Sequence, residues 1–164
     1  MRAPAADCWL YDHAAVARSA IAGQGLFATA PIVEGTAVSR LGGRLVSTAE
    51  LNDLVDVDSV VVNDDLHLVL PAGNRNRYVN HSCEPNLWWT DEYTLSARRD
   101  IAAGEELTLD YSTSTADPQF LLRCHCESYR CRQMVTGDDW RIPQLQRLYA
   151  GHWRPTLQRL IDQL

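Results

Sequence analysis

Three cysteines near the end of the chain have the type and spacing of metal ligands. Cys124, Cys126 and Cys131 form a C-x-C-x4-C pattern. A closed tetrahedral zinc site needs four ligands, so one more must come from elsewhere, and His125 is a local alternative to one of the cysteines. The chain has five cysteines, an odd number that does not pair completely, which favours thiols or metal ligands over disulfides.

Two other stretches carry side chains suited to binding and to group transfer. In Asn80-His81-Ser82-Cys83, the asparagine offers a donor and an acceptor to a nucleoside or to a buried loop. The phenol of Tyr111 can accept a hydrogen bond from an amine and can orient a polarised methyl group. Each also has a plainer interpretation, with His81 as a core histidine or metal ligand and Tyr111 as the end of a buried strand.

Three stretches together resemble the SET-domain protein lysine methyltransferases, including the cysteine tail that follows the domain in many of them. They are RYVNHSCEPN at 77–86, GEELTLDY at 104–111 and CHCESYRC at 124–131. The resemblance spans about residues 22–135. It implies a mostly β fold with short helices and a knot-like threading of the C-terminal part of the domain. It also implies methyl transfer from S-adenosylmethionine to the side-chain amine of a protein lysine.

The resemblance also assigns roles to individual residues. Tyr111 is implied to be the catalytic residue, beside the transferred methyl group and the target nitrogen. The implied cofactor-binding residues are Gly23, Gln24, Gly25, Leu26, Asn80 and His81. A Gly-X-Gly segment lets the backbone approach the amino-acid end of the cofactor, because no side chain intervenes. Without the other motifs, these glycines would be ordinary turn residues.

In relatives that have the tail, the cysteine of the Asn-His-Ser-Cys motif joins the three tail cysteines around one structural zinc ion. The zinc ligands implied in this way are Cys83, Cys124, Cys126 and Cys131. Relatives commonly have glycine where this chain has Glu127 and Gln133. The ligand count therefore matches the family, whereas the turn geometry of the tail is an open question.

Other positions depart from the family pattern. The second residue before the catalytic tyrosine is often aromatic in relatives and is Leu109 here, so it does not indicate how many methyl groups are added. Tyr78 and Tyr93 are candidates, by type only, for a second active-site tyrosine. Met134 and Trp140 are candidates to pack on the adenine or in the core. These departures leave an alternative function open, a catalytically weak SET-like module that binds peptide or cofactor.

The elements that must position these residues are predicted to be mostly short strands. Runs of β-prone residues are separated by Gly, Pro, Asn or Asp, which marks turns between strands. We expect strands within 23–46, 60–70, 88–97 and 106–110, with a turn at 63–65. A capping signal at Ser47 or Thr48, with Glu50 behind it, predicts a short helix over 48–54.

The last third of the chain has a helical pattern, with one segment at 143–149 and an apolar stripe after it. The stripe consists of Trp153, Leu157, Leu160, Ile161 and Leu164. It indicates packing on the β domain, with a wall of the substrate groove or a homodimer contact as alternatives. We expect an N-terminal segment and SET domain over 1–123, the tail over 124–135 and a helical extension over 136–164.

Composition limits the partners and the compartment. A net charge of −6 with 46% hydrophobic residues describes a soluble acidic protein, which argues against direct nucleic-acid binding and makes a nucleic-acid zinc module a poorer alternative. Asp7 and Asp12 interrupt any secretory signal, and no apolar run reaches about 18 residues, so we expect a cytoplasmic protein without membrane association. The expected partner is a protein with an accessible lysine, such as a basic histone-like or ribosomal protein.

Overall fold

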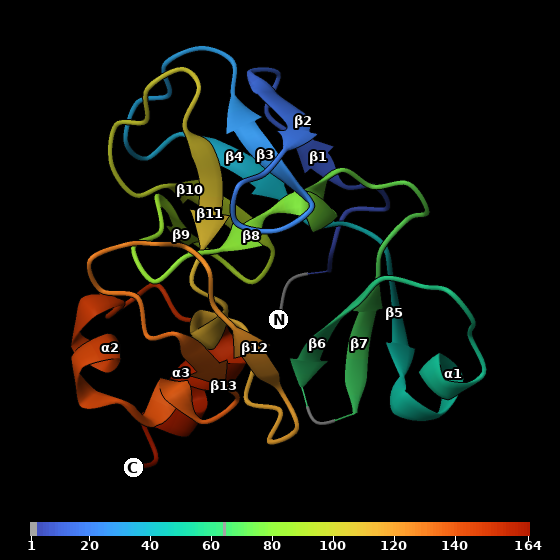
Figure 1. The fold of residues 1–164 in the computed structure, drawn as a ribbon. Coiled ribbons are helices and arrows are strands. Elements are labelled where there is room, and N and C mark those ends of the chain that lie inside the picture. The colour runs from blue at the N-terminus through green and yellow to red at the C-terminus, as the bar shows by residue number, and fades with distance from the viewer. Residues whose placement is uncertain (1–2, 64) are drawn as a thin grey trace.

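The computed structural model describes residues 3–63 and 65–164, and most of its regular elements are short strands (Figure 1). The strands are β1 (Trp9–Leu10), β2 (Ala14–Arg18), β3 (Gln24–Ala28), β4 (Ala37–Arg40), β5 (Arg44–Ser47), β6 (Ser59–Asn63), β7 (Leu66–Val69), β8 (Asn80–His81), β9 (Leu87–Trp89), β10 (Thr94–Ala97), β11 (Glu106–Leu109), β12 (Leu121–Arg123) and β13 (Met134–Thr136). The α-helices are α1 (Thr48–Asn52), α2 (Pro143–Leu148) and α3 (Pro155–Ile161). The predicted fold class, mostly β with short helices, is confirmed.

The strands of the described residues form four small sheets. Two four-stranded sheets, in the orders β1-β4-β10-β9 and β2-β3-β11-β8, enclose the main hydrophobic core. The β5-β7-β6 sheet lies with α1 on one side of the molecule, and the β12-β13 hairpin lies with α2 and α3 on the other (Figure 1). These two flanking parts face each other across the centre of the molecule.

Helix α1 begins where the capping signal predicts. Ser47 is its N-cap, and its Oγ accepts the backbone N–H of Glu50 while the Glu50 carboxylate accepts the N–H of Ser47. The helix ends at Asn52, two residues earlier than expected. The β6–β7 hairpin confirms the pair of strands predicted within 60–70, and Asp64 in the predicted turn lies outside the described residues.

Strands β1, β2, β8, β12 and β13 lie outside the predicted ranges. Strand β2 pairs with β3 along its whole length, from Ala14 opposite Ala28 to Arg18 opposite Gln24. Its alanine-rich sequence has little β-propensity of its own, so the partner strand decides its conformation. Strand β12 likewise exists through its pairing with β13.

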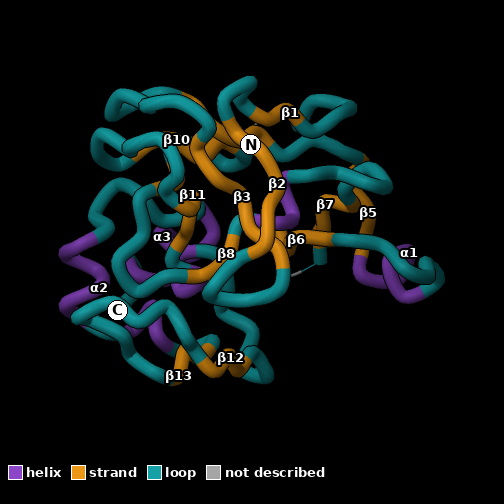
Figure 2. Tube along the Cα trace, turned by 45° about the horizontal axis from the view of Figure 1, so that its top comes forward, coloured by secondary structure: helices purple, strands orange, loops and turns teal. Residues whose placement is uncertain are grey.

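The pairing that matters most for the site joins β8 to β11. The two strands run parallel, with Asn80 opposite Thr108 and His81 opposite Leu109. Figure 2 shows them together with β3, which pairs with the other edge of β11. Since Tyr111 follows β11 directly, this pairing brings two sequence motifs that are about thirty residues apart next to each other.

The C-terminal extension packs through a second hydrophobic cluster. Its buried members are Trp140, Leu145, Tyr149, Trp153 and Leu157. Helix α3 begins at Pro155, which suits the first turn of a helix, so Trp153 of the predicted stripe precedes the helix, and Leu164 lies past its end with 73% of its surface exposed. None of the helices in the described residues is both long enough and apolar enough to cross a lipid bilayer.

Candidate active site and metal centre

A hydrogen-bond network around Glu106 ties the loop before β3 to β8. The Asn80 Nδ2 group donates to Glu106 Oε1 at 2.7 Å and to the carbonyls of Ala22 and Gln24 at 3.2 and 3.0 Å. Ser19 Oγ donates to both carboxylate oxygens of Glu106 at 2.8 Å. From the sequence, Glu106 is an ordinary turn charge unless it supports the knot-like core through a hydrogen bond, and the structure places it at the centre of this network.

Gly25 packs against the network so closely that a side chain would not fit. A Cβ placed on it would lie 2.2 Å from Glu106 Oε1 and 3.1 Å from Asn80 Nδ2. Gly23 lies in the left-handed region, with φ of 49°, and space is open beside it. The Leu26 side chain is fully buried in the main core, so only the main chain of this residue can face a ligand.

Tyr111 is held at both ends by groups of the 79–81 segment. Its hydroxyl donates to the carbonyl of Val79 at 2.8 Å, and its backbone N–H donates to Nδ1 of His81 at 3.1 Å. Because Nδ1 accepts, the proton of a neutral His81 ring lies on Nε2, which is 3.4 Å from the sulfur of Cys83. Burial lowers the pKa of His81 to about 4, so the ring is neutral at pH 7.

Two cavities meet at Tyr111. The small cavity, of about 70 Å³, brings together Ala22, Asn80, His81 and residues 122–125, where β12 leads into the tail. The large cavity, of about 390 Å³, lies between β6, the 76–79 segment and the approach to the tail. Tyr111 lines both of them. Burial, reinforced by the charge of Glu106, raises the pKa of Tyr111, so the phenol stays protonated at neutral pH.

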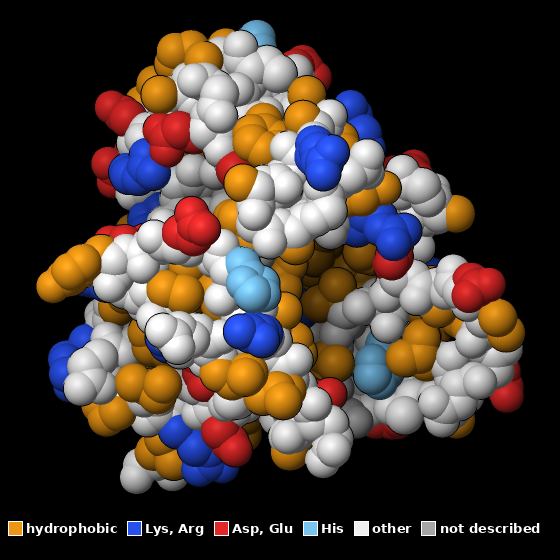
Figure 3. Space-filling view, viewed as in Figure 1, with side chains coloured by type: hydrophobic (Ala, Val, Ile, Leu, Met, Phe, Trp, Pro, Cys, Tyr) orange, Lys and Arg blue, Asp and Glu red, His pale blue; other side chains and the backbone are white. Residues whose placement is uncertain are grey.

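The large cavity has mainly apolar walls. Figure 3 shows a hollow with a hydrophobic floor at the centre of the molecule, between the β5-β7-β6 sheet and the tail. Its apolar lining includes Val60, Val61, Leu70, Val79, Leu109 and Phe120. Leu109, the position that is often aromatic in relatives, therefore faces this space beside Tyr111. The small cavity is below the range of about 300–1,000 Å³ that is usual for ligand pockets, so a whole nucleoside cofactor would extend beyond it.

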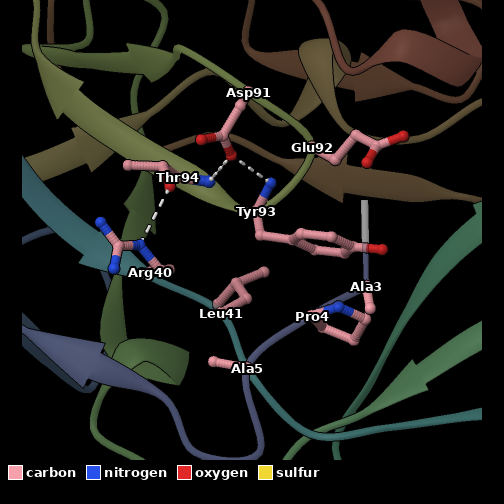
Figure 4. A pocket seen from close by; sticks show the side chains of 9 residues that line it. All are labelled: Ala3, Pro4, Ala5, Arg40, Leu41, Asp91, Glu92, Tyr93 and Thr94. Carbon is pink, nitrogen blue, oxygen red and sulfur yellow. Dashed lines mark hydrogen bonds between the residues drawn. The ribbon is translucent and has the colours of Figure 1, made fainter. Parts of the chain in front are cut away.

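Tyr111 is the only tyrosine among the described residues that line these two cavities. Tyr93 lines a different cavity, where Figure 4 shows its ring directed toward Ala3 and Pro4. Tyr78 packs against the main core. Neither candidate for a second active-site tyrosine therefore shares a cavity with Tyr111.

The four cysteines assigned to zinc converge. The sulfur atoms of Cys83, Cys124, Cys126 and Cys131 all lie within 4.8 Å of one another, and those of Cys83 and Cys124 are 3.9 Å apart. Zinc–sulfur bonds of about 2.3 Å in a tetrahedron place sulfurs about 3.8 Å apart, so the spacing fits a zinc ion. His125 is not part of this group and lines the small cavity instead.

Backbone groups are arranged to support thiolates. Each of the four sulfurs accepts a backbone N–H, donated by Arg132, Cys126, Cys83 and Gln133 at 3.3 to 3.5 Å. Glu127 and Gln133 adopt φ values of 54° and 61°, in the left-handed region that favours glycine. The tail therefore keeps a glycine-type turn geometry at both positions without glycine.

A buried ion pair connects the tail to the residue before Tyr111. The Arg132 guanidinium donates two hydrogen bonds of 2.7 Å to Asp110, and its Nε donates to Asp139 at 3.0 Å. Tyr149 of the extension also donates to Asp110, at 3.0 Å. Burial pushes the pKa of Asp110 upward, but the hydrogen bonds and charge of Arg132, together with His81 and Ser112, hold this pKa below its ordinary value. Sequence reasoning missed this network, since nothing local links Asp110 to Arg132.

The two apolar residues suggested for the adenine lie elsewhere. Trp140 is buried in the cluster of the C-terminal extension, and Met134 on β13 is 45% exposed. Neither lines the small cavity, whose tail side is formed by residues 122–125. Trp140 is therefore a core residue, which was the alternative interpretation of its sequence position.

Comparison with known proteins supports the same family as the motifs. The family model of the SET domain matches residues 23–112, more than half of the chain. Histone-lysine N-methyltransferase ash1 of Drosophila melanogaster is 32% identical over 146 residues, which cover 78% of this chain. Histone-lysine N-methyltransferase 2B of Homo sapiens is 33% identical over 141 residues, which cover 73%. The chain spans only 6% and 5% of the lengths of these two relatives.

Solved structures show the same fold. The methyltransferase domain of human histone-lysine N-methyltransferase SETMAR matches 77% of this chain and 58% of its own, with a TM-score of 0.61 and 24% identity. KRYPTONITE, solved in complex with mCHG DNA and SAH, matches 76% of this chain and 29% of its own, with a TM-score of 0.59 and 27% identity. From its motifs, its fold and the match over residues 23–112, this chain belongs to the SET-domain family.

Proposed function

We propose that this chain is a protein lysine methyltransferase that uses S-adenosylmethionine. The observation that carries the proposal is the position of Tyr111, whose phenol lines both the small cavity beside Asn80 and His81 and the large apolar cavity. A donor and an acceptor that enter from opposite sides would meet at this residue. The family match and the names of the relatives support the same activity.

The small cavity is the proposed cofactor side. S-adenosylmethionine supplies the methyl group when bound, and SAH, the compound left after that transfer, is bound in the KRYPTONITE structure. The residues proposed to hold it are the main chain of 23–26 together with Asn80 and His81. The close approach of Gly25 to Asn80 and Glu106 supports this assignment, because the network fixes the loop that would face the ligand.

The large cavity is the proposed entrance for the target lysine. A lysine with a pKa of about 10.4 must lose its proton first, which costs about 4–5 kcal/mol at neutral pH unless the surroundings lower that pKa. The apolar walls favour the neutral amine by removing water. The Tyr111 hydroxyl already donates to Val79, so its lone pairs remain to accept a hydrogen bond from the amine.

We further propose that the four cysteines bind one structural zinc ion that orders the tail. The fit of the sulfur spacing to a tetrahedral site supports this. Cys131→Ser should reduce the zinc measured per chain, whereas Cys8→Ser should not, because Cys8 bonds only to the Gly42 backbone in the described residues. Full zinc retention by Cys131→Ser would remove this cysteine from the ligand set.

The substrate is proposed to be a lysine-containing protein, with basic histone-like or ribosomal proteins as first candidates. The names of the relatives and the net charge of −6 support this choice. A cytoplasmic location, the lack of direct nucleic-acid binding and a homodimer through α3 remain predictions from the sequence. Mass spectrometry of methylated proteins in cell extract would identify the target and the number of methyl groups.

The activity is tested by incubating the chain with labelled S-adenosylmethionine and lysine-containing proteins. Tyr111→Phe should abolish or strongly reduce methyl transfer and leave cofactor affinity nearly intact, because the ring is kept and only the hydroxyl is lost. Unchanged turnover would contradict the role of Tyr111. Cofactor or peptide binding without any transfer by the unmodified chain would instead favour the alternative, a SET-like binding module.

A further inference from the structure

The β6 strand has one free edge, and the C-terminal extension covers one end of it. Among the residues that the structure describes, β6 of the β5-β7-β6 sheet pairs only with β7. A bulge between Val61 and Asn63 interrupts that pairing, and the Arg154 Nη1 group donates to the carbonyl of Val61 at 2.6 Å. Thr156 donates to the carbonyl of Val62. Helix α3 therefore occupies acceptors at the end of β6 that an added strand would need.

Arg154 is fixed in this position by several contacts. It is only 3% exposed, a second guanidinium nitrogen donates to the carbonyl of Glu92, and its guanidinium lies 5.2 Å from the centre of the Trp89 ring. Its hydrogen bonds are thus directed at backbone carbonyls. At the junction between β6 and α3, the carbonyls at the end of the strand are therefore occupied, and the Arg154 guanidinium is held by backbone carbonyls.

A cavity of about 190 Å³ lies at this junction and continues from the large cavity. Both are lined by Val61, Ser114 and Thr115. The carbon surface on the side of the extension comes from Leu157 and Leu160. We call this space the α3 cavity. Except for Val61 and Asn63, its lining residues follow residue 112, where the match to the family model ends.

We propose that helix α3 ends the substrate groove and that the α3 cavity receives an apolar side chain of the peptide whose lysine reaches Tyr111. This inference rests on the proposed function, because the groove is the one that leads to Tyr111. The peptide would lie along the free edge of β6 and stop at the sealed carbonyls of Val61 and Val62. Because α3 ends the groove at a fixed distance from Tyr111, it would fix how many residues separate the apolar side chain from the target lysine.

The chemistry of the lining favours an apolar occupant over a charged one. One cation, Arg154, and one carboxylate, Asp117, line the cavity, so the charges of the lining do not favour an acidic side chain. Arg154 also donates to two carbonyls and lies over the Trp89 ring. The Oδ1 atom of Asp117 accepts the N–H of Gln119 at 2.8 Å. Val61, which joins the two cavities, is 46% exposed, so burying it under a peptide would stabilise the complex.

The test uses synthetic peptides of fifteen residues with one central lysine in a background of serine and glycine. In one set, a single leucine is placed in turn at each position except that of the lysine. In a second set, a single glutamate is placed in the same way. Methyl transfer from labelled S-adenosylmethionine and binding by fluorescence anisotropy are both measured. Leucine at one position, on one side of the lysine, should raise kcat/KM and affinity about tenfold over serine.

The variant Leu160→Arg should remove the gain from leucine and favour glutamate at the same position. Leu164→Arg is the matched control, since Leu164 does not line the cavity and is already exposed. Leu160→Ala, a milder change, should weaken the leucine gain without creating a glutamate preference. Melting temperatures show whether each variant folds, and Leu160→Ala keeps the test valid if Leu160→Arg does not fold.

The two readouts separate this inference from the proposed function. Suppose the peptides are methylated but leucine gives no gain at any position, or gives the same gain in the folded Leu160 variants. Either result would overturn the proposed role of the α3 cavity and leave the proposed methyltransferase activity supported. Binding with the expected leucine gain but no methylation would support the proposed role of the α3 cavity and contradict the proposed methyltransferase activity. Absence of both binding and transfer for every peptide would count against both.

Discussion

Replacing Gly25 with alanine should disconnect Glu106 from its partners. The new Cβ would lie 2.2 Å from Glu106 Oε1. Because Oε1 ends a flexible side chain, we expect the carboxylate to move away and the backbone to stay. Gly25 is outside the left-handed region, so alanine adds no backbone strain there. The hydrogen bonds from Asn80 and Ser19 to Glu106 would be broken.

The size of the effect follows from the bonds lost. A hydrogen bond to a charged group contributes about 1.5–3 kcal/mol, and the lower figure applies here because Asn80, Ser19 and Glu106 are only partly buried. Gly25→Ala should therefore lower the free energy of unfolding by about 3 kcal/mol. Glu106→Ala should cost a similar amount. In the double variant the carboxylate of Glu106 is absent, so the new Cβ at position 25 no longer clashes with it. The two losses in free energy of unfolding should therefore not add, and the coupling free energy should be about 3 kcal/mol.

Urea denaturation of the two single variants and the double variant measures this coupling. Glu105→Ala is the matched control, because Glu105 bonds to Arg99 and to the N–H of Ala102 instead. It should combine additively with Gly25→Ala, within about 0.5 kcal/mol. Calorimetry with S-adenosylmethionine should show weaker binding in both Gly25→Ala and Glu106→Ala. Simple additivity of Gly25→Ala and Glu106→Ala would refute the reasoning.

Three further variants test the tail and its connection to Tyr111. Asp110→Asn should cost about 3 kcal/mol in chemical denaturation, because it leaves the partly buried Arg132 with Asp139 as its remaining counter-charge. The pKa of Asp110 is lowered in the folded protein, so the difference in free energy of unfolding between the unmodified chain and this variant should be full above about pH 4. The difference should shrink at lower pH as Asp110 is protonated, and a pH-independent difference would contradict the ion pair. Tyr149→Phe, which removes one hydrogen bond to Asp110, should cost only about 1 kcal/mol by the same assay, and a larger loss would mean that the hydroxyl holds more than this bond. The double substitution Glu127→Gly and Gln133→Gly should raise the melting temperature of the zinc-loaded protein, since glycine relieves up to about 1 kcal/mol at each left-handed residue; a lower melting temperature would show that neither residue is strained.

Local sequence patterns were sufficient where a short segment decides its own structure. The capping box at Ser47 and Glu50 marks the start of α1, and the β-prone runs on either side of the turn at 63–65 mark the β6–β7 hairpin. Strands β1 and β2 could not be found in this way. Strand β1 has only two residues and the alanine-rich β2 has no strong preference of its own, so the pairing with β4 and β3 makes them strands.

The candidate site divides along the same line. The sequence by itself determined the family, because three short motifs carry the resemblance, and that resemblance proposed the tyrosine, the Asn-His pair and the cysteines as site residues. Only the tertiary structure decided that Glu106 is the centre of a network, that Arg132 neutralises Asp110 and that α3 seals the end of β6. These contacts join residues that are 22 to 94 positions apart. Which residues pair in these contacts depends on how the sheets, the tail and the C-terminal extension pack together, and local sequence spacing does not predict that packing.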